Sequence, residues 1–172
     1  MKKTNDITQE KLADAFKTER PHLLRYACYR LGNEDDAKDV LQDTFLRLHT
    51  RIADADDLQI SNLRSYIFRT LTNVCAKWQT GANKIKTIPL DTRIDVADTH
   101  YMGNETEYRR IARLLTEIPD EQAEVIRLRI YGDNSFAEVA EILSLPLPTV
   151  KSRFLYGQEK LRKGLKKTIS NY

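Results

Sequence analysis

Hydroxyl, ammonium and guanidinium groups follow one another near the end of the chain, at Thr149, Lys151, Ser152 and Arg153. From Ser144 onward there are seven Lys or Arg and one acidic residue, a net charge of +6, whereas residues 105–143 carry −4. The whole-chain charge of +3 hides this basic end. Such a cluster suits a phosphate backbone, although a solvated basic helix end is also common.

Two helices joined by a tight turn must position these groups. Ser135 and Glu138 have the spacing of a capping box, and apolar residues then recur at helical intervals. Pro146 and Pro148 prevent the first helix from continuing, and Pro148 suits the first turn of a second helix. A helix-turn-helix just before a basic helix favours binding to duplex DNA.

A second candidate set lies on a helix expected from Ser61, as its N-cap, to about Gln79. Aromatic, basic and amide side chains share one face at steps of three and four residues. Rings can stack on unpaired bases and amides can read base edges. Half-buried residues of these types are also ordinary in helices, so both interpretations stay open for Tyr66, Arg69, Asn73 and Lys77.

A third candidate is the outer face of the preceding helix, which is expected to run from an Asn33 cap to about Thr50. Acidic and hydrogen-bonding residues lie there, among them Asp39, Gln42 and Asp43. Such a face is usually solvated, but it could also dock a basic partner helix.

Several function classes lack support in this sequence. Cys28 and Cys75 lie on apolar stripes, which predicts buried free thiols rather than a disulfide. The three histidines match no metal-ligand spacing, and no phosphate-binding loop or nucleophile motif is present. No segment resembles a signal peptide or a membrane span. We therefore expect a cytoplasmic protein that is not an enzyme and uses no metal or cofactor.

The helical periods predict an all-α fold of two small domains, at residues 1–80 and 105–172. The N-terminal segment is helical to Leu31, and Pro21 either kinks it or starts a second helix. Gly32 suits the residue after the helix end. Residues 53–59 form an acidic loop. Residues 81–104 have no sustained period and are expected to be a flexible linker.

Three sequence blocks carry a family resemblance. IPDEQAEVIRLR, SFAEVAEIL and TVKSR, in this order, resemble the C-terminal domain of bacterial sigma-70 family factors. DAKDVLQDTFLRLHTR and LRSYIFRTLTNV resemble the family's polymerase-binding helix and promoter-melting segment. With only two domains, the chain is similar to the small extracytoplasmic-function (ECF) group, from about Phe16 to Lys166.

The resemblance implies a promoter-specific initiation factor with three binding surfaces. The acidic set Asp39, Gln42 and Asp43 would bind core RNA polymerase, and Tyr66, Arg69, Asn73 and Lys77 would bind the minus-ten strand. The second helix of the helix-turn-helix would read the minus-thirty-five element, and Arg153 suits bidentate contacts to guanine. The expected minus-thirty-five set is Thr149, Lys151, Ser152, Arg153 and Leu155, with Lys160 and Arg162 on phosphates.

The resemblance also has implications for regulation, and this chain departs from the family's sequence pattern at three places. Family members are commonly held inactive by an anti-sigma factor that covers both domains. AKWQTGANK lacks the acidic residue and clustered arginines usual at the end of the melting helix, Pro148 replaces a usual Gly, and Tyr156-Gly157 replaces a common Arg-Ala. Two alternatives remain: a sigma-like decoy that sequesters an anti-sigma factor, and a stand-alone helix-turn-helix regulator.

Overall fold

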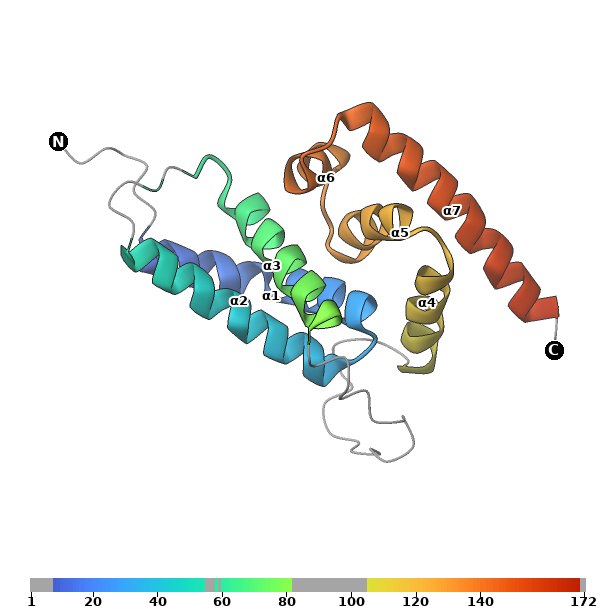
Figure 1. The fold of residues 1–172 in the computed structure, drawn as a ribbon, viewed down its shortest axis with the longest axis horizontal. Coiled ribbons are helices and arrows are strands. Elements are labelled where there is room, and N and C mark those ends of the chain that lie inside the picture. Colours follow the sequence, from blue (N-terminus) through green and yellow to red (C-terminus); the bar gives the residue numbers. More distant parts are fainter. Residues whose placement is uncertain (1–7, 55–57, 59, 82–104, 171–172) are drawn as a thin grey trace.

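The computed structural model describes residues 8–54, 58, 60–81 and 105–170, without the side chains of 105–108 and 168–169. All regular structure in these ranges is helical, so the all-α prediction is confirmed (Figure 1). No helix in the described ranges is long and apolar enough to cross a membrane. The elements are α1 (Gln9–Leu31), α2 (Glu34–Asp54), α3 (Leu63–Thr80), α4 (Glu105–Glu117), α5 (Asp120–Ile126), the π-helical η3 (Arg127–Tyr131), α6 (Phe136–Leu143) and α7 (Leu147–Ser170).

The ends of the N-terminal helices follow local capping chemistry. Helix α1 runs through Pro21 without a break, which decides between the two alternatives for that residue. It ends at Gly32, whose φ of 74° places it in the left-handed region and whose N–H bonds to Cys28 O at 2.8 Å. Asn33 then caps α2 by accepting from the Asp36 N–H at 3.1 Å, as expected.

The predicted cap of α3 was wrong by one residue. Asn62, and not Ser61, is the N-cap, and its Oδ1 accepts from the Ser65 N–H at 3.2 Å. Ser and Asn are both good N-cap residues, so local preference does not distinguish Ser61 from Asn62. The position at which the chain enters the bundle decides which of them caps α3. Helix α2 continues to Asp54, so the first two residues of the predicted acidic loop are helical and that boundary was wrong. Residues 55–57 and 59 of the loop lie outside the described residues, as does the predicted linker after Gly81.

The first bundle buries a continuous apolar core between α1, α2 and α3. Its largest fully buried side chains include Leu12, Leu41 and Phe68. Cys28 and Cys75 are both buried thiols outside any disulfide, as predicted. Burial raises the pKa of the Cys75 thiol to about 12, so this thiol is unreactive at neutral pH.

The helix-turn-helix forms as its sequence predicts. The Ser135–Glu138 capping box is complete, with both bonds at 3.1 Å. Helix α6 ends at Leu143 and is followed by the C-cap Ser144, which has a left-handed φ of 54°. Helix α7 starts at Leu147, with Pro148 in its first turn. An edge-to-face pair of Phe136 and Phe154, with ring centroids 5.1 Å apart, sets one helix against the other.

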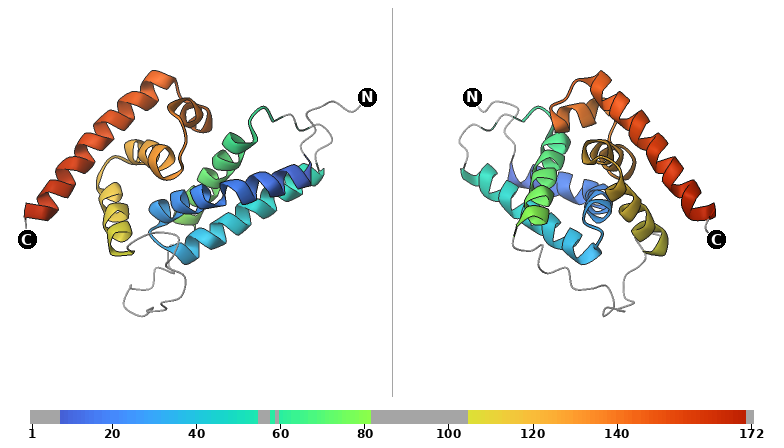
Figure 2. Two further views of the ribbon diagram at one scale, coloured as in Figure 1. Left: turned by 180° about the vertical axis from the view of Figure 1, so that it is seen from behind. Right: turned by 45° about the vertical axis from the view of Figure 1, so that its right-hand side comes forward.

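The second bundle, made of α4, α5, η3, α6 and α7, packs against the first bundle of α1, α2 and α3. Helices α1 and α3 contact α4, η3 and α6, and we call this packing the closed arrangement. Helix α7 lies on the outer side of the second bundle, away from α1–α3 (Figure 2). Gly132 permits the close approach, since a Cβ there would lie 3.1 Å from the Phe68 ring and 2.8 Å from Leu128 O.

Candidate nucleic-acid interface

The acidic face of α2 is open to a partner. Asp39 and Gln42 are exposed, and Asp43 is half-buried with its carboxylate 3.1 Å from Arg47 Nε. Leu46, with 54% of its surface exposed, lies one turn from Gln42 and was missed from the sequence because it falls outside the apolar stripe. Burial, followed by repulsion from Asp39 and Asp35, raises the pKa of Asp36.

The predicted minus-ten residues on α3 divide into two groups. Asn73 and Lys77 are exposed on the side of α3 that faces α2. Arg69 points to α6 instead: it donates to the carbonyl oxygens of Glu141 at 2.6 Å and Ile142 at 3.3 Å. Its Nη2 also lies 2.8 Å from Ser144 Oγ. The Nε and Nη2 groups of Arg69 are therefore engaged by the end of α6, while the residue as a whole remains exposed.

A shallow groove between α2 and α3 gathers further basic groups. Asn73 and Lys77 line it together with Arg47 and Arg51, and its volume is about 260 Å³. The Arg51 guanidinium also lies 5.7 Å from the centre of the half-buried Tyr66 ring. Sequence reasoning left these two arginines out of the set, although their spacing of four residues on α2 was a usable signal. They supply basic groups beside Lys77, where AKWQTGANK is poor in arginine.

The predicted recognition residues on α7 do not share one face. Lys151, Ser152 and Leu155 are exposed, and Leu155 has 64% of its surface open. Thr149 and Arg153, four residues apart on α7, are half-buried. Arg153 Nη2 lies 3.4 Å from the Glu121 carboxylate, which is itself largely exposed. An exposed pair of this kind is weak, so Arg153 can exchange Glu121 for another partner.

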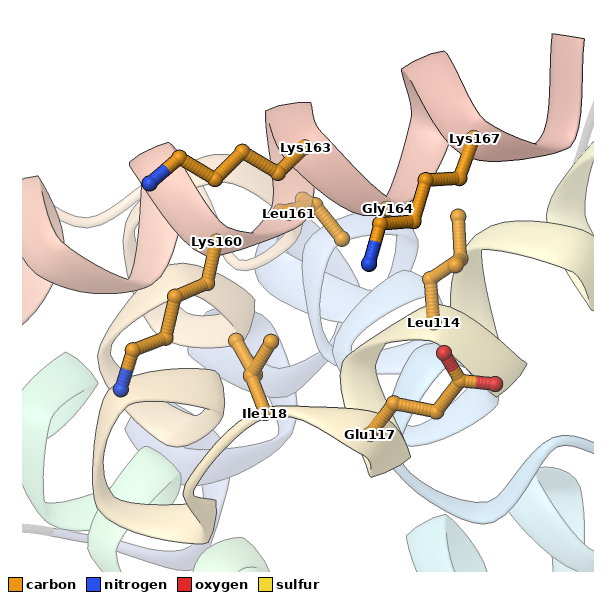
Figure 3. Close-up of a pocket in the computed structure, with 8 residues that line it drawn as sticks. All are labelled: Leu114, Glu117, Ile118, Lys160, Leu161, Lys163, Gly164 and Lys167. Carbon is orange, nitrogen blue, oxygen red and sulfur yellow. The ribbon is translucent and has the colours of Figure 1, made fainter. Parts of the chain in front are cut away.

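The two predicted phosphate contacts lie on different sides of α7. Arg162 is exposed at helical spacing from Lys151 and Leu155. Lys160 lines a groove of about 260 Å³ between α4 and α7, together with Lys163 and Lys167. Leu114, Ile118 and Leu161 form the apolar part of this groove, as Figure 3 shows. Of the two predicted phosphate contacts, Arg162 and not Lys160 therefore lies on the same exposed face of α7 as Lys151.

Arg64 of α3 is the centre of a polar cluster that joins the two bundles. Its Nε lies 2.9 Å from Glu19 Oε2 in α1, and its Nη1 lies 2.6 Å from Glu138 Oε2 in α6. The same guanidinium donates to Asn134 Oδ1 at 2.7 Å and to two backbone oxygens near Gly132 at 3.0 Å. Burial lowers the pKa of Arg64, but the bonds to Glu19 and Glu138 outweigh it and leave the pKa raised.

Glu124 of α5 forms a second buried cluster with α1. Its carboxylate lies 2.7 Å from Arg30 Nη1 and 3.3 Å from Arg127 Nη1, and it accepts a hydrogen bond from the Tyr26 hydroxyl. Burial, and then the negative charge of Glu124, raise the pKa of Tyr26 well above 10.0. Tyr29 and Tyr131 stack beside this cluster, with ring centroids 3.6 Å apart. Nothing in the sequence pattern singled out either cluster.

Comparisons with known proteins assign both halves of the chain to one family. Residues 15–84 match sigma-70 region 2, and residues 114–163 match sigma-70 region 4. The ECF RNA polymerase sigma factor SigW of Bacillus subtilis is 28% identical, over 81% of each chain. RNA polymerase sigma factor YlaC of the same organism is 20% identical over 93% of this chain and 95% of its own.

Two solved structures share the fold. CnrH, in complex with the cytosolic domain of CnrY, superposes with a TM-score of 0.67 over 93% of this chain and 90% of its own, at 22% identity. The sigma factor RpoE of Bartonella quintana, in complex with the anti-sigma factor NepR, gives 0.65 over 91% and 98%, at 20% identity. With regions 2 and 4 both present in order, the chain belongs to the sigma-70 family, as a member of its ECF group.

Proposed function

We propose that this ECF sigma factor binds core RNA polymerase through the exposed acidic face of α2 and directs it to promoters through α3 and α7. Sigma factors are transcription initiation factors and not enzymes, so no catalytic residue or cofactor is needed. Residues 1–80 would bind the polymerase and the minus-ten strand, and residues 105–172 would bind the minus-thirty-five duplex. Both partners place the protein in the cytoplasm.

The observation that carries this proposal is the pairing, in one chain, of the acidic α2 face with a complete helix-turn-helix. A stand-alone regulator would have no use for the exposed Asp39 and Gln42. A decoy would need no groove for an unpaired strand, yet Arg47 and Arg51 accompany Asn73 there. An acidic face of this kind is complementary in charge to a basic partner helix, which favours docking.

On DNA, we assign the exposed Lys151, Ser152 and Leu155 to the major groove, with Arg162 on the phosphates. Arg153 reaches a base only after it leaves Glu121, and the surface position of that ion pair makes the exchange inexpensive. Loss of a bidentate contact to guanine would cost about 1–3 kcal/mol of discrimination. An anti-sigma partner is a further expectation, since RpoE is seen with the anti-sigma factor NepR and CnrH is seen with the cytosolic domain of CnrY.

Run-off transcription with purified core polymerase and a library of randomised promoters tests the proposal. We expect promoter-specific transcripts from the wild type, none from Asp39→Arg, and a changed minus-thirty-five preference from Arg153→Ala. Lys38→Ala is the matched control on α2, because Lys38 is beside Asp39 and pairs only with Glu34 among the described residues. Polymerase binding without any transcript, together with tight binding to an anti-sigma protein, would establish the decoy instead.

A further inference from the structure

Two neighbouring residues of α7 expose large apolar surfaces to solvent. Leu155 has 64% of its surface exposed and Tyr156 has 60%, the highest values among the large hydrophobic residues of the described ranges. Single exposed apolar side chains are ordinary, but a contiguous apolar patch rimmed by polar groups marks an interaction site. Helix α7 packs through other residues, such as Phe154 against α6 and Gly157 against α5, so its own packing does not account for the exposed pair.

The exposed pair shares one face of α7 with Lys151 and Ser152. Residues four apart are neighbours on a helix surface, so Leu155 lies one turn after Lys151, and Tyr156 lies one turn after Ser152. All four residues are exposed, whereas Gly157 is buried. Since each residue turns the helix by about 100°, the centre of this four-residue face lies roughly opposite Gly157, where α7 packs closely on α5. The packing at Gly157 thus decides that Leu155 and Tyr156 point outward.

The surroundings of the pair are basic. Lys151 lies one turn before Leu155, and the exposed Arg162 lies two turns after it on the same side of the helix. The chain from Ser144 onward carries a net charge of +6, which attracts a phosphate backbone. An apolar pair within a basic face fits a DNA duplex, which offers phosphates at the rim of its groove and base edges inside it.

The major groove of DNA offers an apolar group at one base, the C5 methyl of thymine, whereas guanine is recognised there through its acceptors O6 and N7. The Leu155 side chain has no hydrogen-bond donor, and the ring face of Tyr156 has none either. Neither residue can donate twice to guanine, as an arginine can. Apolar contact with a thymine methyl group is therefore the base recognition that this pair can provide.

The spacing along α7 gives the position of the thymine relative to the other base contacts. A helix rises about 1.5 Å per residue, so Leu155 and Tyr156 lie about 6 Å beyond Lys151 and Ser152 along the axis. For a helix that lies along the major groove, this is about two steps of 3.4 Å between bases. The Ser152 hydroxyl donates to Pro148 O at 3.0 Å, which leaves its oxygen free to accept from the amino group of adenine or cytosine.

We propose that Leu155 and Tyr156 recognise thymine methyl groups in the minus-thirty-five element, so that this factor selects A·T pairs about two base steps from the base contacted by Lys151 or Ser152. This inference rests on the proposed function and names the base specificity that α7 confers. It gives a role to Tyr156, which stands where Arg is common: a donor suited to guanine is replaced by an apolar ring. Arg162 adds affinity for any sequence, and the apolar pair adds the choice of base.

Removal of single methyl groups from the DNA tests this assignment. Transcription from randomised promoters by core polymerase with the wild-type factor first gives the preferred minus-thirty-five sequence, in which we expect thymine at one or two adjacent positions. Deoxyuridine in place of each of these thymines removes only the C5 methyl group. We expect promoter affinity to fall about fourfold for each methyl group removed, the effect of one apolar carbon that is no longer buried.

Variants of the pair test the same contact from the side of the protein. Leu155→Ala and Tyr156→Ala should each become insensitive to deoxyuridine at the thymine that the missing side chain contacts, because the two changes remove one interaction. Tyr156→Phe keeps the ring and should keep the preference, whereas Tyr156→Arg should replace thymine by guanine at its position. Ile130→Ala is the matched control: Ile130 is another apolar residue of the second bundle, has 43% of its surface exposed, and lies on η3 rather than α7. This control should change neither the preferred sequence nor the effect of deoxyuridine.

The outcomes separate this inference from the proposed function. If promoter-specific transcripts appear but deoxyuridine has no effect, or has the same effect on the wild type and both alanine variants, thymine recognition by the pair is overturned and the initiation function stands. If the alanine variants lose transcription equally from every promoter, whether it carries thymine or deoxyuridine, the pair contacts a protein instead, which also overturns the inference.

Absence of any transcript from the wild type would count against the initiation function. In that case, selection of randomised duplexes by the whole free chain decides thymine recognition without polymerase. Enrichment of thymine-containing duplexes that bind more weakly with deoxyuridine supports the inference, and selection without a thymine preference overturns it.

Discussion

Nη1 of Arg64 in α3 and Oε2 of Glu138 in α6 lie 2.6 Å apart, although 74 residues separate them along the chain. Glu138 has a second role, because its Oε1 accepts from the Ser135 N–H at 3.1 Å and completes the capping box of α6. One carboxylate therefore starts the first helix of the helix-turn-helix and also joins the two bundles. A change at Glu138 should affect both local helix stability and the closed arrangement.

The first prediction concerns pH. Burial raises the pKa of Glu138, but bonds from Ser135 and Arg64 outweigh it, so the pKa lies below its usual value of 4.5. A carboxyl group with a lowered pKa stabilises the folded state above its unfolded pKa, and this stabilisation disappears as pH falls through the folded pKa. Urea unfolding should show wild type more stable than Glu138→Gln above about pH 5, with the difference shrinking toward pH 3. If the difference in stability between wild type and Glu138→Gln stays the same over this pH range, the lowered pKa of Glu138 is contradicted.

Removal of the Glu124 carboxylate should be strongly destabilising. Glu124→Ala leaves Arg30 without its anion and leaves Arg127 with only the largely exposed Asp120, at 3.6 Å. The loss of one partner from a buried pair costs about 3–5 kcal/mol. Denaturant unfolding measures the effect. Glu117→Ala, at an exposed position of α4, is the control and should stay within about 0.5 kcal/mol of wild type. A loss for Glu124→Ala as small as that of the control would mean that water already solvates the cluster.

Gly157 illustrates how packing can reverse a helix preference. Replacement of Gly by Ala within a helix usually gains about 1 kcal/mol. At Gly157, however, a Cβ would lie 2.9 Å from Ile126 Cδ1 and 3.0 Å from Gln122 Cβ, so α7 must move away from α5. Overpacking of this kind costs about 1–3 kcal/mol, and we expect Gly157→Ala to destabilise the protein by about 1 kcal/mol in thermal unfolding. The departure from the common Ala thus has a packing reason.

Gly164 provides the matched comparison on the same helix. A Cβ there would meet only the end of the Leu114 side chain, at 3.2 Å, and that side chain can rotate. Gly164→Ala should therefore cause no loss of stability. Equal changes in stability for Gly157→Ala and Gly164→Ala would show that close helix packing does not determine the effect of either substitution.

The basic groove between α2 and α3 gives a prediction about salt. If Arg51 contacts a phosphate of the unpaired strand, Arg51→Ala should weaken promoter binding by the holoenzyme, which is core RNA polymerase with this sigma factor bound. The slope of log K against log salt should also become shallower by about 0.7, the value for one phosphate on a single strand. Lys17→Ala removes one exposed charge from α1 and should leave the slope unchanged. Weaker binding with an unchanged slope would assign Arg51 to the support of Tyr66 rather than to DNA.

The sequence alone determined most of the local structure, although it named Ser61 rather than Asn62 as the cap of α3. Helix ends at Gly32, Asn33 and Ser135 follow from the hydrogen bonds of single residues and their near neighbours, and the structure confirms each of them. The apolar period likewise predicted the helices and the buried thiols. These features depend on residues within one or two turns of each other, so a pattern in the chain is sufficient to predict them.

Only the tertiary structure decided which of the polar groups meet. Arg64 stands among other arginines in the sequence, and its five acceptors come from α1, from α6 and from the turn between η3 and α6. The same packing brings Arg69 to the end of α6 and Arg51 to Tyr66, and it buries Glu124 between Arg30 and Arg127. Charged side chains carry no periodic signal for their distant partners, because the partner is set by how whole helices pack and not by local backbone preference.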